Sequence, residues 1–157
     1  MSNEMMTGAG WEFPTRISIN LTRRCNLRCK HCLSSSGHAD PNELTTAELF
    51  GLVDQLGEAG KPTLAIGGGE PLMRTDLFAV MARARRNGVP VSIVTNGIFV
   101  NDRIAKRMND LGLASITVSV DGLRQNHELI RGVGSFEKTI RGIETLKKWV
   151  TTAKLGV

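Results

Sequence analysis

The segment RISINLTRRCNLRCKHC, residues 16–32, joins a strand pattern directly to a group of cysteines. Ile17, Ile19 and Leu21 alternate with polar residues, which is typical of a strand with one apolar face. All three cysteines of the chain follow, spaced Cys-x3-Cys-x2-Cys among arginine and lysine residues. In proteins built from βα units, functional groups gather where parallel strands end. The segment therefore suggests a βα architecture with a site at the end of its first strand.

The same alternation of strand and helix continues along the chain. Thr45 and Glu48 form a capping-box pattern at the start of the first helix, and Asp76 is expected to cap the second. The last helix is expected to bury its apolar residues, which are Phe136, Ile140, Ile143 and Leu146. The predicted strands are 16–21, 63–66, 89–95 and 115–120, and the predicted helices are 45–60, 76–87, 101–112 and 135–150.

Four βα units in succession predict an α/β fold with a parallel sheet, because parallel strands need a crossover between them. A closed barrel needs more units than these. We therefore expect a partial (β/α) barrel with about four βα units and a truncated fifth strand in residues 151–157. Residues 14–157 would form this domain as the N-terminal portion of a longer architecture, preceded by a flexible leader at 1–13.

The composition is that of an ordinary globular protein, with 41% hydrophobic and 22% charged residues and a net charge of +5. No apolar run is long enough to span a membrane, and the N-terminus lacks the apolar region of a signal peptide. We therefore expect a cytoplasmic location without a membrane partner. The aromatic content is 4% and tyrosine is absent, which makes nucleic acid an unlikely partner.

Cys25, Cys29 and Cys32 are the candidate metal ligands. An odd number of cysteines in a reducing compartment argues against a disulfide framework. Structural zinc would need a fourth ligand, which His38 could supply. Three thiolates can instead hold a [4Fe–4S] cluster with one iron left open for a substrate or cofactor. The cysteine spacing alone therefore leaves both a zinc site completed by His38 and an iron–sulfur cluster open, and the neighbouring cations would favour thiolates.

The segment CNLRCKHC (25–32), followed after the next strand by GGGEP (67–71), resembles the signature of the radical S-adenosylmethionine (SAM) superfamily. The resemblance covers about residues 14–157. It implies a [4Fe–4S] cluster on the three cysteines, whose open iron chelates SAM. One electron from the cluster then cleaves SAM to methionine and a 5′-deoxyadenosyl radical, which abstracts a substrate hydrogen. It also implies a reductant such as flavodoxin or ferredoxin.

The resemblance also indicates which residues contact SAM. Gly68 and Gly69 would let the backbone approach the ligand, since glycine has no Cβ, and Glu70 would accept a hydrogen bond from the methionine ammonium. His127 is expected to be structural. The other expected contacts lie at or after the ends of the predicted strands. They are Thr95, Asn96, Ser119, Asp121, Arg131 (for the SAM carboxylate) and His31 (near the adenine). Thr95, Asn96 and Asp121 also fit plain turns.

The string HCLSSSG (31–37), ELTT (43–46) and IGGGEPLMR (66–74) is similar to the peptide-modifying SPASM-type branch of the superfamily, in particular to the mycofactocin maturases. That branch implies a small precursor peptide as substrate. Other readings stay open: a haem or molybdenum-cofactor biosynthesis enzyme, an RNA-modifying enzyme, a truncated non-catalytic iron–sulfur half-barrel, and a zinc-binding interaction module. The sequence alone does not name the substrate.

Overall fold

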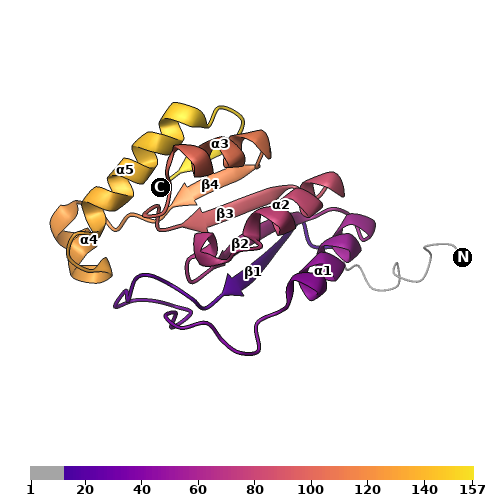
Figure 1. The fold of residues 1–157 in the computed structure, drawn as a ribbon, viewed down its shortest axis with the longest axis horizontal. Coiled ribbons are helices and arrows are strands. Elements are labelled where there is room, and N and C mark those ends of the chain that lie inside the picture. Colours follow the sequence, from indigo (N-terminus) through magenta and orange to yellow (C-terminus); the bar gives the residue numbers. More distant parts are fainter. Residues whose placement is uncertain (1–12) are drawn as a thin grey trace, which may run out of the picture.

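The computed structural model describes residues 13–157 (Figure 1). The predicted leader at 1–13 therefore lies outside the described residues, apart from Phe13. The described chain forms one five-stranded sheet in the order β1-β2-β3-β4-β5, and every neighbouring pair is parallel. The predicted α/β fold with an open parallel sheet is confirmed. The strands are β1 (Arg16–Thr22), β2 (Thr63–Gly68), β3 (Val91–Thr95), β4 (Ser115–Val118) and β5 (Lys154–Gly156).

The helices connect successive strands as predicted, with two additions. The short 3-10 helix η2 follows the glycines at the end of β2, and α4 covers eight residues that lie outside the predicted helices. Only His127 is buried in α4, so this helix has no apolar stripe that the sequence could reveal. The helices are α1 (Thr46–Glu58), η2 (Pro71–Met73), α2 (Leu77–Arg86), α3 (Asp102–Asp110), α4 (Arg124–Arg131) and α5 (Ser135–Trp149).

The two faces of the sheet differ in composition. Leu64, Ile93 and Ile116 are almost fully buried, in one hydrophobic core with side chains of α1, α2, α3 and α5. Figure 1 shows these helices following the sheet from α1 beside β1 to α5 beside β4. On the opposite face several alternate positions carry serine or threonine, and Ser115 donates a hydrogen bond to Ser92 across the register at 2.9 Å. The apolar core therefore lies on the helix side of the sheet.

Two details of the helices differ from the predictions. The Thr45–Glu48 capping box is present, but the Asp76 side chain caps nothing; Arg74 and Thr46 donate to it instead. Of the predicted apolar stripe of α5 only Leu146 is fully buried, whereas Phe136, Ile140 and Ile143 are half-buried. The other fully buried residues of α5 are small or polar, namely Ser135, Thr139 and Gly142. The reason is that α5 packs tightly on the turn after β3, where any Cβ on Gly142 would overlap the carbonyl oxygen of Gly97.

No helix among residues 13–157 combines the length and the apolar character that crossing a membrane requires.

Candidate functional site

The loops that follow β1, β2, β3 and β4 surround a single cavity of about 440 Å³ at the carboxyl edge of the sheet. This edge is where the sequence places its candidate residues. Two of them, Glu70 and Asp121, are not among the lining residues. Those that line the cavity are Cys25, Cys29, Cys32, His31, Gly68, Gly69, Thr95, Asn96, Ser119 and Arg131.

The cysteines lie in the segment between β1 and α1, residues 23–45, which we call the cysteine loop. Within this loop the structure forms only an isolated bridge between Arg24 and Gly37. Gly37 N donates to Arg23 O at 2.7 Å, and Cys25 N donates to Gly37 O at 3.1 Å. These bonds fold the loop back on itself beside the end of β1. The thiols thus lie in the segment that this bridge between Arg24 and Gly37 closes.

The three thiols are free and half-buried. Burial raises the pKa of Cys25, and it raises the pKa of Cys29 although Arg131 acts in the opposite direction. The pKa of Cys32 is lowered, chiefly because Ser36 N donates to its Sγ at 3.3 Å. For Cys25 and Cys29, burial therefore outweighs the nearby cations that were expected to favour thiolates.

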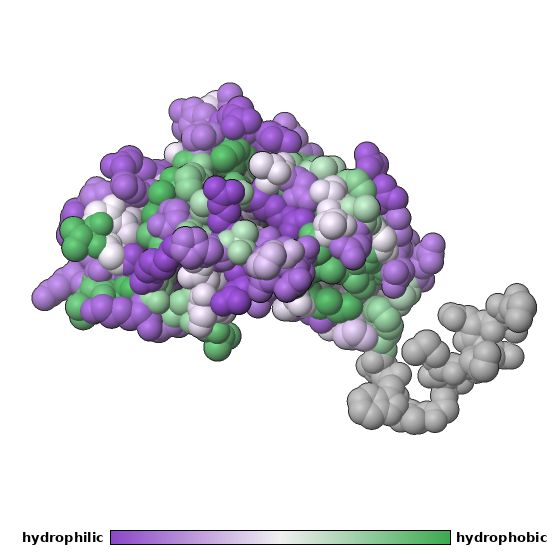
Figure 2. Space-filling model, turned by 60° about the horizontal axis from the view of Figure 1, so that its bottom comes forward, coloured by the Kyte–Doolittle hydropathy of each residue, from purple (hydrophilic) through white to green (hydrophobic). Residues whose placement is uncertain are grey.

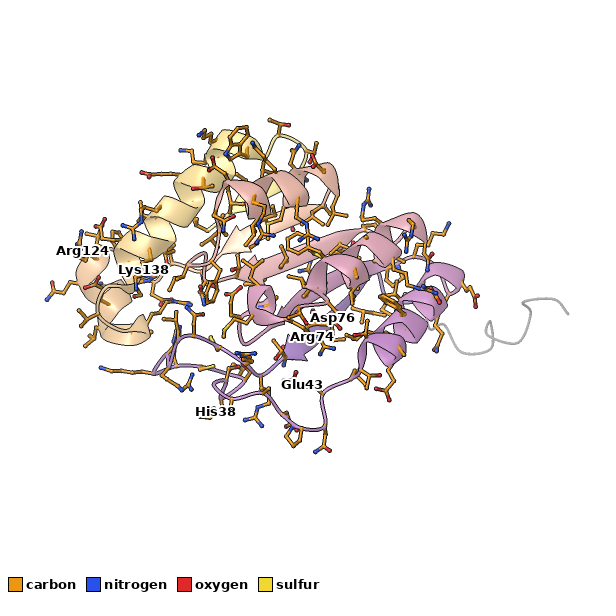
Figure 3. All side chains as sticks on the ribbon, in the orientation of Figure 1. His38, Glu43, Arg74, Asp76, Arg124 and Lys138 are labelled. Carbon is orange, nitrogen blue, oxygen red and sulfur yellow. The ribbon has the colours of Figure 1, made fainter. Side chains whose placement is uncertain are left out.

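The donor set fits an iron–sulfur cluster. A mononuclear site needs its ligands to converge to about 2.3 Å from one ion, and no three Cys, His, Asp or Glu side chains do so within residues 13–157. A four-iron cube places each thiolate on a different iron, so its ligands stay apart. Three thiols around one cavity, with N–H groups directed at two of the sulfurs, meet that requirement. His38, the possible fourth zinc ligand, is exposed and does not line the cavity (Figure 3).

The glycines at the end of β2, Gly67 to Gly69, serve two purposes. A Cβ on Gly68 would overlap Thr22 O, and one on Gly69 would overlap Arg24 O. Gly69 N also donates to Thr22 O at 2.7 Å. These two glycines are therefore needed for close contact with the end of β1 and the cysteine loop. Gly67, in contrast, lines the cavity with nothing within 4 Å of its Cβ position, so its backbone is the one open to a ligand.

Glu70 lies behind the cavity wall and is fully buried. Its Oε1 accepts hydrogen bonds from Leu72 N at 3.1 Å and Thr95 Oγ1 at 2.8 Å, and its Oε2 accepts one from Asn96 N at 2.8 Å. Burial raises the pKa of Glu70, while these donors oppose the rise. The carboxylate thus joins the turn after β2 to the turn after β3, and it does not face the cavity as the predicted ammonium contact would require.

Thr95 and Asn96 are buried and mostly engaged within the protein. The Thr95 hydroxyl donates to Glu70, and it accepts a bond from Gly97 N at 3.0 Å. Asn96 Nδ2 donates to Asn26 Oδ1 in the cysteine loop at 2.8 Å. The side chains of these two residues therefore shape the wall of the cavity.

Arg131, Asp121 and His31 form a connected group beside the cysteines. Arg131 Nε and Nη2 donate to the two oxygens of Asp121 at 2.6 and 3.2 Å, and His31 Nε2 lies 3.4 Å from Asp121 Oδ1. The hydrogen bond from Arg131 is the main reason why the pKa of Asp121 is lowered. Both carboxylate oxygens of Asp121 thus bind Arg131, which lines the cavity.

His127 is fully buried beneath this group. Its Nδ1 accepts a hydrogen bond from Asp121 N at 3.4 Å, and its ring meets Phe136 edge-on with centroids 5.5 Å apart. Burial lowers its pKa, which favours the neutral ring. This is the structural position that the sequence suggested.

Several cavity residues were not anticipated, namely Asn20, Leu27, Leu33, Ser34, Ser36 and Val94. For Asn20 a signal existed, because it alternates with Ile19 and Leu21 and so faces away from the core. For the residues of the cysteine loop the sequence gives no such signal, since their position depends on how the loop folds. Leu33 is fully exposed. Figure 2 shows, on the side that the cysteine loop occupies in Figure 1, a mainly hydrophilic surface with small hydrophobic patches.

Comparison with known proteins gives a consistent result. The model of the radical SAM superfamily matches residues 19–152. Fe-coproporphyrin III synthase of Methanosarcina barkeri is 39% identical over 131 residues, which are 82% of this chain and 33% of that protein. Mycofactocin maturase MftC of Mycolicibacterium smegmatis is 35% identical over 150 residues, 94% of this chain and 38% of that protein. The chain thus spans between about a third and two fifths of the length of these relatives.

Among solved structures, Streptococcus suis SuiB bound to S-adenosylmethionine has a similar fold. The TM-score is 0.78, and the match covers 91% of this chain and 33% of that one. At 17% sequence identity, this likeness concerns the fold alone.

Proposed function

Because this chain belongs to the radical SAM superfamily, whose enzymes bind a [4Fe–4S] cluster and SAM, we propose that it holds the cluster through Cys25, Cys29 and Cys32 and cleaves SAM reductively. The observation that carries the proposal is geometric. The three free thiols, the open backbone of Gly67 and the guanidinium of Arg131 all line one cavity. When bound, the cluster supplies the electron that splits the sulfonium to a 5′-deoxyadenosyl radical.

The residues of the chain bind and orient SAM. Arg131 donates two N–H groups to Asp121, and its other N–H groups would bind the SAM carboxylate. Arginine makes such charge-assisted contacts well. The Gly67 backbone approaches the methionine end, and Glu70 acts through the Thr95–Asn96 turn that it holds. Ser119 and His31 both line the cavity, where Ser119 would contact the ribose and His31 the adenine.

We propose a ribosomal peptide or a cofactor precursor as the substrate. Two relatives support this range by name: one is a mycofactocin maturase and the other an Fe-coproporphyrin III synthase. The reductant is a one-electron carrier such as flavodoxin or ferredoxin. Three free thiols also fit the cytoplasmic location that the composition predicts, because a reducing compartment keeps thiols available to iron.

The decisive experiment is anaerobic reconstitution with iron and sulfide, followed by addition of dithionite and SAM. We expect a brown protein that forms 5′-deoxyadenosine. Replacing Cys25, Cys29 and Cys32 with alanine removes all three thiolates, so both the chromophore and the product should disappear. A full iron load in the triple variant would refute the proposed cluster site. Adding a precursor peptide or a coproporphyrin and measuring its consumption then separates the two substrate classes.

A further inference from the structure

The cysteine loop is long and irregular, so its shape depends on how its two ends are held. It begins directly after β1 and ends at α1, and within it only the Arg24–Gly37 bridge is regular. Nothing in the function described above explains what fixes these ends. Figure 3 labels three charged residues, Glu43, Arg74 and Asp76, close to the end of β1 and the start of α1.

Glu43 connects the two ends of the loop. Its Oε1 accepts hydrogen bonds from Thr22 Oγ1 at 2.9 Å and from Arg23 N at 2.8 Å, where the loop begins. The same oxygen accepts one from Asp40 N at 3.1 Å, near the end of the loop. Burial acts to raise the pKa of Glu43, but these donors and Arg74 outweigh it and the pKa is lowered. Glu43 is therefore held as a carboxylate between the two ends.

Arg74 binds both ends from the other side. Its Nη1 donates to Leu21 O at 2.9 Å, and its Nη2 donates to Leu44 O at 2.6 Å. Nη1 also lies 3.6 Å from Glu43 Oε2. The side chain is only 12% exposed, so solvent competes little for these contacts. One guanidinium thus joins the last residues of β1 to the last residues of the cysteine loop.

Asp76 orients the guanidinium. Its carboxylate accepts Arg74 Nε at 2.7 Å and Nη2 at 3.1 Å, and it also accepts Thr46 Oγ1 from the start of α1 at 2.6 Å. This explains why Asp76 does not cap α2. Arg74 itself follows η2, which continues from the glycine segment after β2. Arg74 therefore also connects the cysteine loop to the segment that carries the glycines, which form another wall of the cavity.

We propose that Arg74, oriented by Asp76 and paired with Glu43, is a positioning residue that closes the base of the cysteine loop and thereby sets how SAM meets the cluster. This inference rests on the proposed function. Arg74 does not line the cavity, so it acts through the loop and touches neither group. Lysine in its place keeps the charge but cannot make the forked contacts with Asp76 and both carbonyls.

The test compares Arg74→Met and Arg74→Lys with the control Arg83→Met. Arg83 makes a similar two-bond ion pair, to Asp54 at 2.7 and 2.6 Å, which connects α2 to α1 away from the cysteine loop. The first measurement is hydrogen exchange of the cluster-free protein. In Arg74→Met we expect the loop amides of Cys25 and Gly37 to exchange on the order of tenfold faster, and in Arg83→Met at the parental rate.

The second measurement is SAM affinity at equal iron content, with the SAM-induced change in the electron paramagnetic resonance spectrum of the reduced cluster. We expect Arg74→Met to need on the order of tenfold more SAM for the same spectral change, Arg74→Lys an intermediate amount, and Arg83→Met no more than the parent. A general loss of stability would affect both methionine variants and would not separate them in this way.

Parental exchange rates and parental SAM affinity in Arg74→Met would overturn the inference. If that variant does not fold, Asp76→Asn replaces it, because it keeps the guanidinium and loosens only its orientation. If the parent itself takes up no cluster or no SAM, the proposed function fails, while the exchange measurement still decides whether Arg74 closes the loop.

Discussion

The sheet with its helices and the cysteine loop are held together by different forces. In the sheet and helices, Ile93, Met81 and Leu77 are completely buried and belong to one continuous apolar core. In the cysteine loop the attachments are polar: backbone bridges, Glu43 and Arg74. Apolar burial is strong but not directional, whereas hydrogen bonds fix orientation. The comparison indicates that the core provides the stability and that a few half-buried polar groups provide the geometry of the site.

The largest effect on stability is expected when a core side chain of β3 is shortened. Ile93→Ala leaves a cavity in a site with no exposure, so we expect the free energy of unfolding to fall by about 2–5 kcal/mol. Urea denaturation of the cluster-free protein measures this. Substituting the exposed Leu33 with alanine is the control and should change stability by less than about 0.5 kcal/mol. Equal effects in the two variants would contradict the division of roles.

A sharper test concerns Glu70, which is buried like a core residue but joins two turns by hydrogen bonds. Glu70→Ala leaves Thr95 Oγ1 and the amides of Asn96 and Leu72 without their acceptor. Loss of a hydrogen bond to a charged group costs about 1.5–3 kcal/mol, so the free energy of unfolding should fall by about this amount. Because Thr95 and Asn96 line the cavity, the loosened turn should also lower SAM affinity, on the order of tenfold, while the iron content is retained. Calorimetric titration with SAM measures it.

Glu70→Gln keeps the size of the side chain and removes its charge. The amide NH2 group of the glutamine would face one of the N–H or O–H donors and lose that hydrogen bond, while its oxygen keeps the other. We therefore expect a SAM affinity between those of the parent and Glu70→Ala. Parental affinity in Glu70→Ala would show that the turn after β3 holds its shape without this carboxylate.

Helix α1 allows a smaller test of the regular part of the chain. Thr45 caps this helix by accepting a hydrogen bond from Glu48 N at 3.3 Å. Thr45→Ala should lower the free energy of unfolding by about 1 kcal/mol, because the cap is lost. Thr45→Ser keeps the hydroxyl and should behave like the parent. The exchange rate of the loop amides should change in neither variant, and faster exchange in Thr45→Ala alone would show that the loop depends on the helix cap.

The smallest expected effect is the pH dependence of the α1–α2 ion pair. Hydrogen bonds from Arg83 and Asn87 lower the pKa of Asp54 from 3.8 to about 2. A lowered pKa in the folded state contributes stability above pH 3.8, and this contribution is lost as the pH falls from about 4 to about 2. Thermal unfolding of the parent and of Asp54→Asn should therefore converge across this range. A constant difference down to pH 2 would contradict the assignment.

The sequence by itself determined the order of the elements and the side of the sheet on which the site lies. Alternating residues in β1 and the capping box of α1 are local patterns with a fixed period, so they predict structure without knowledge of the fold. The same applies to the cysteine spacing and to the glycines after β2. Because the carboxyl ends of parallel strands meet at one edge, these motifs were expected to come together, and they line one cavity.

Only the tertiary structure decided what each polar residue does. Glu70 meets Thr95 across 25 positions, and Arg74 meets Leu21 across 53. At the second contact the acceptor is a backbone carbonyl, which every residue type has, so no sequence pattern marks it. Arg74 was therefore missed, and Asp76 was assigned a cap that it does not form. Local periodicity is written in the sequence, whereas a contact between distant polar groups exists only after packing has brought them together.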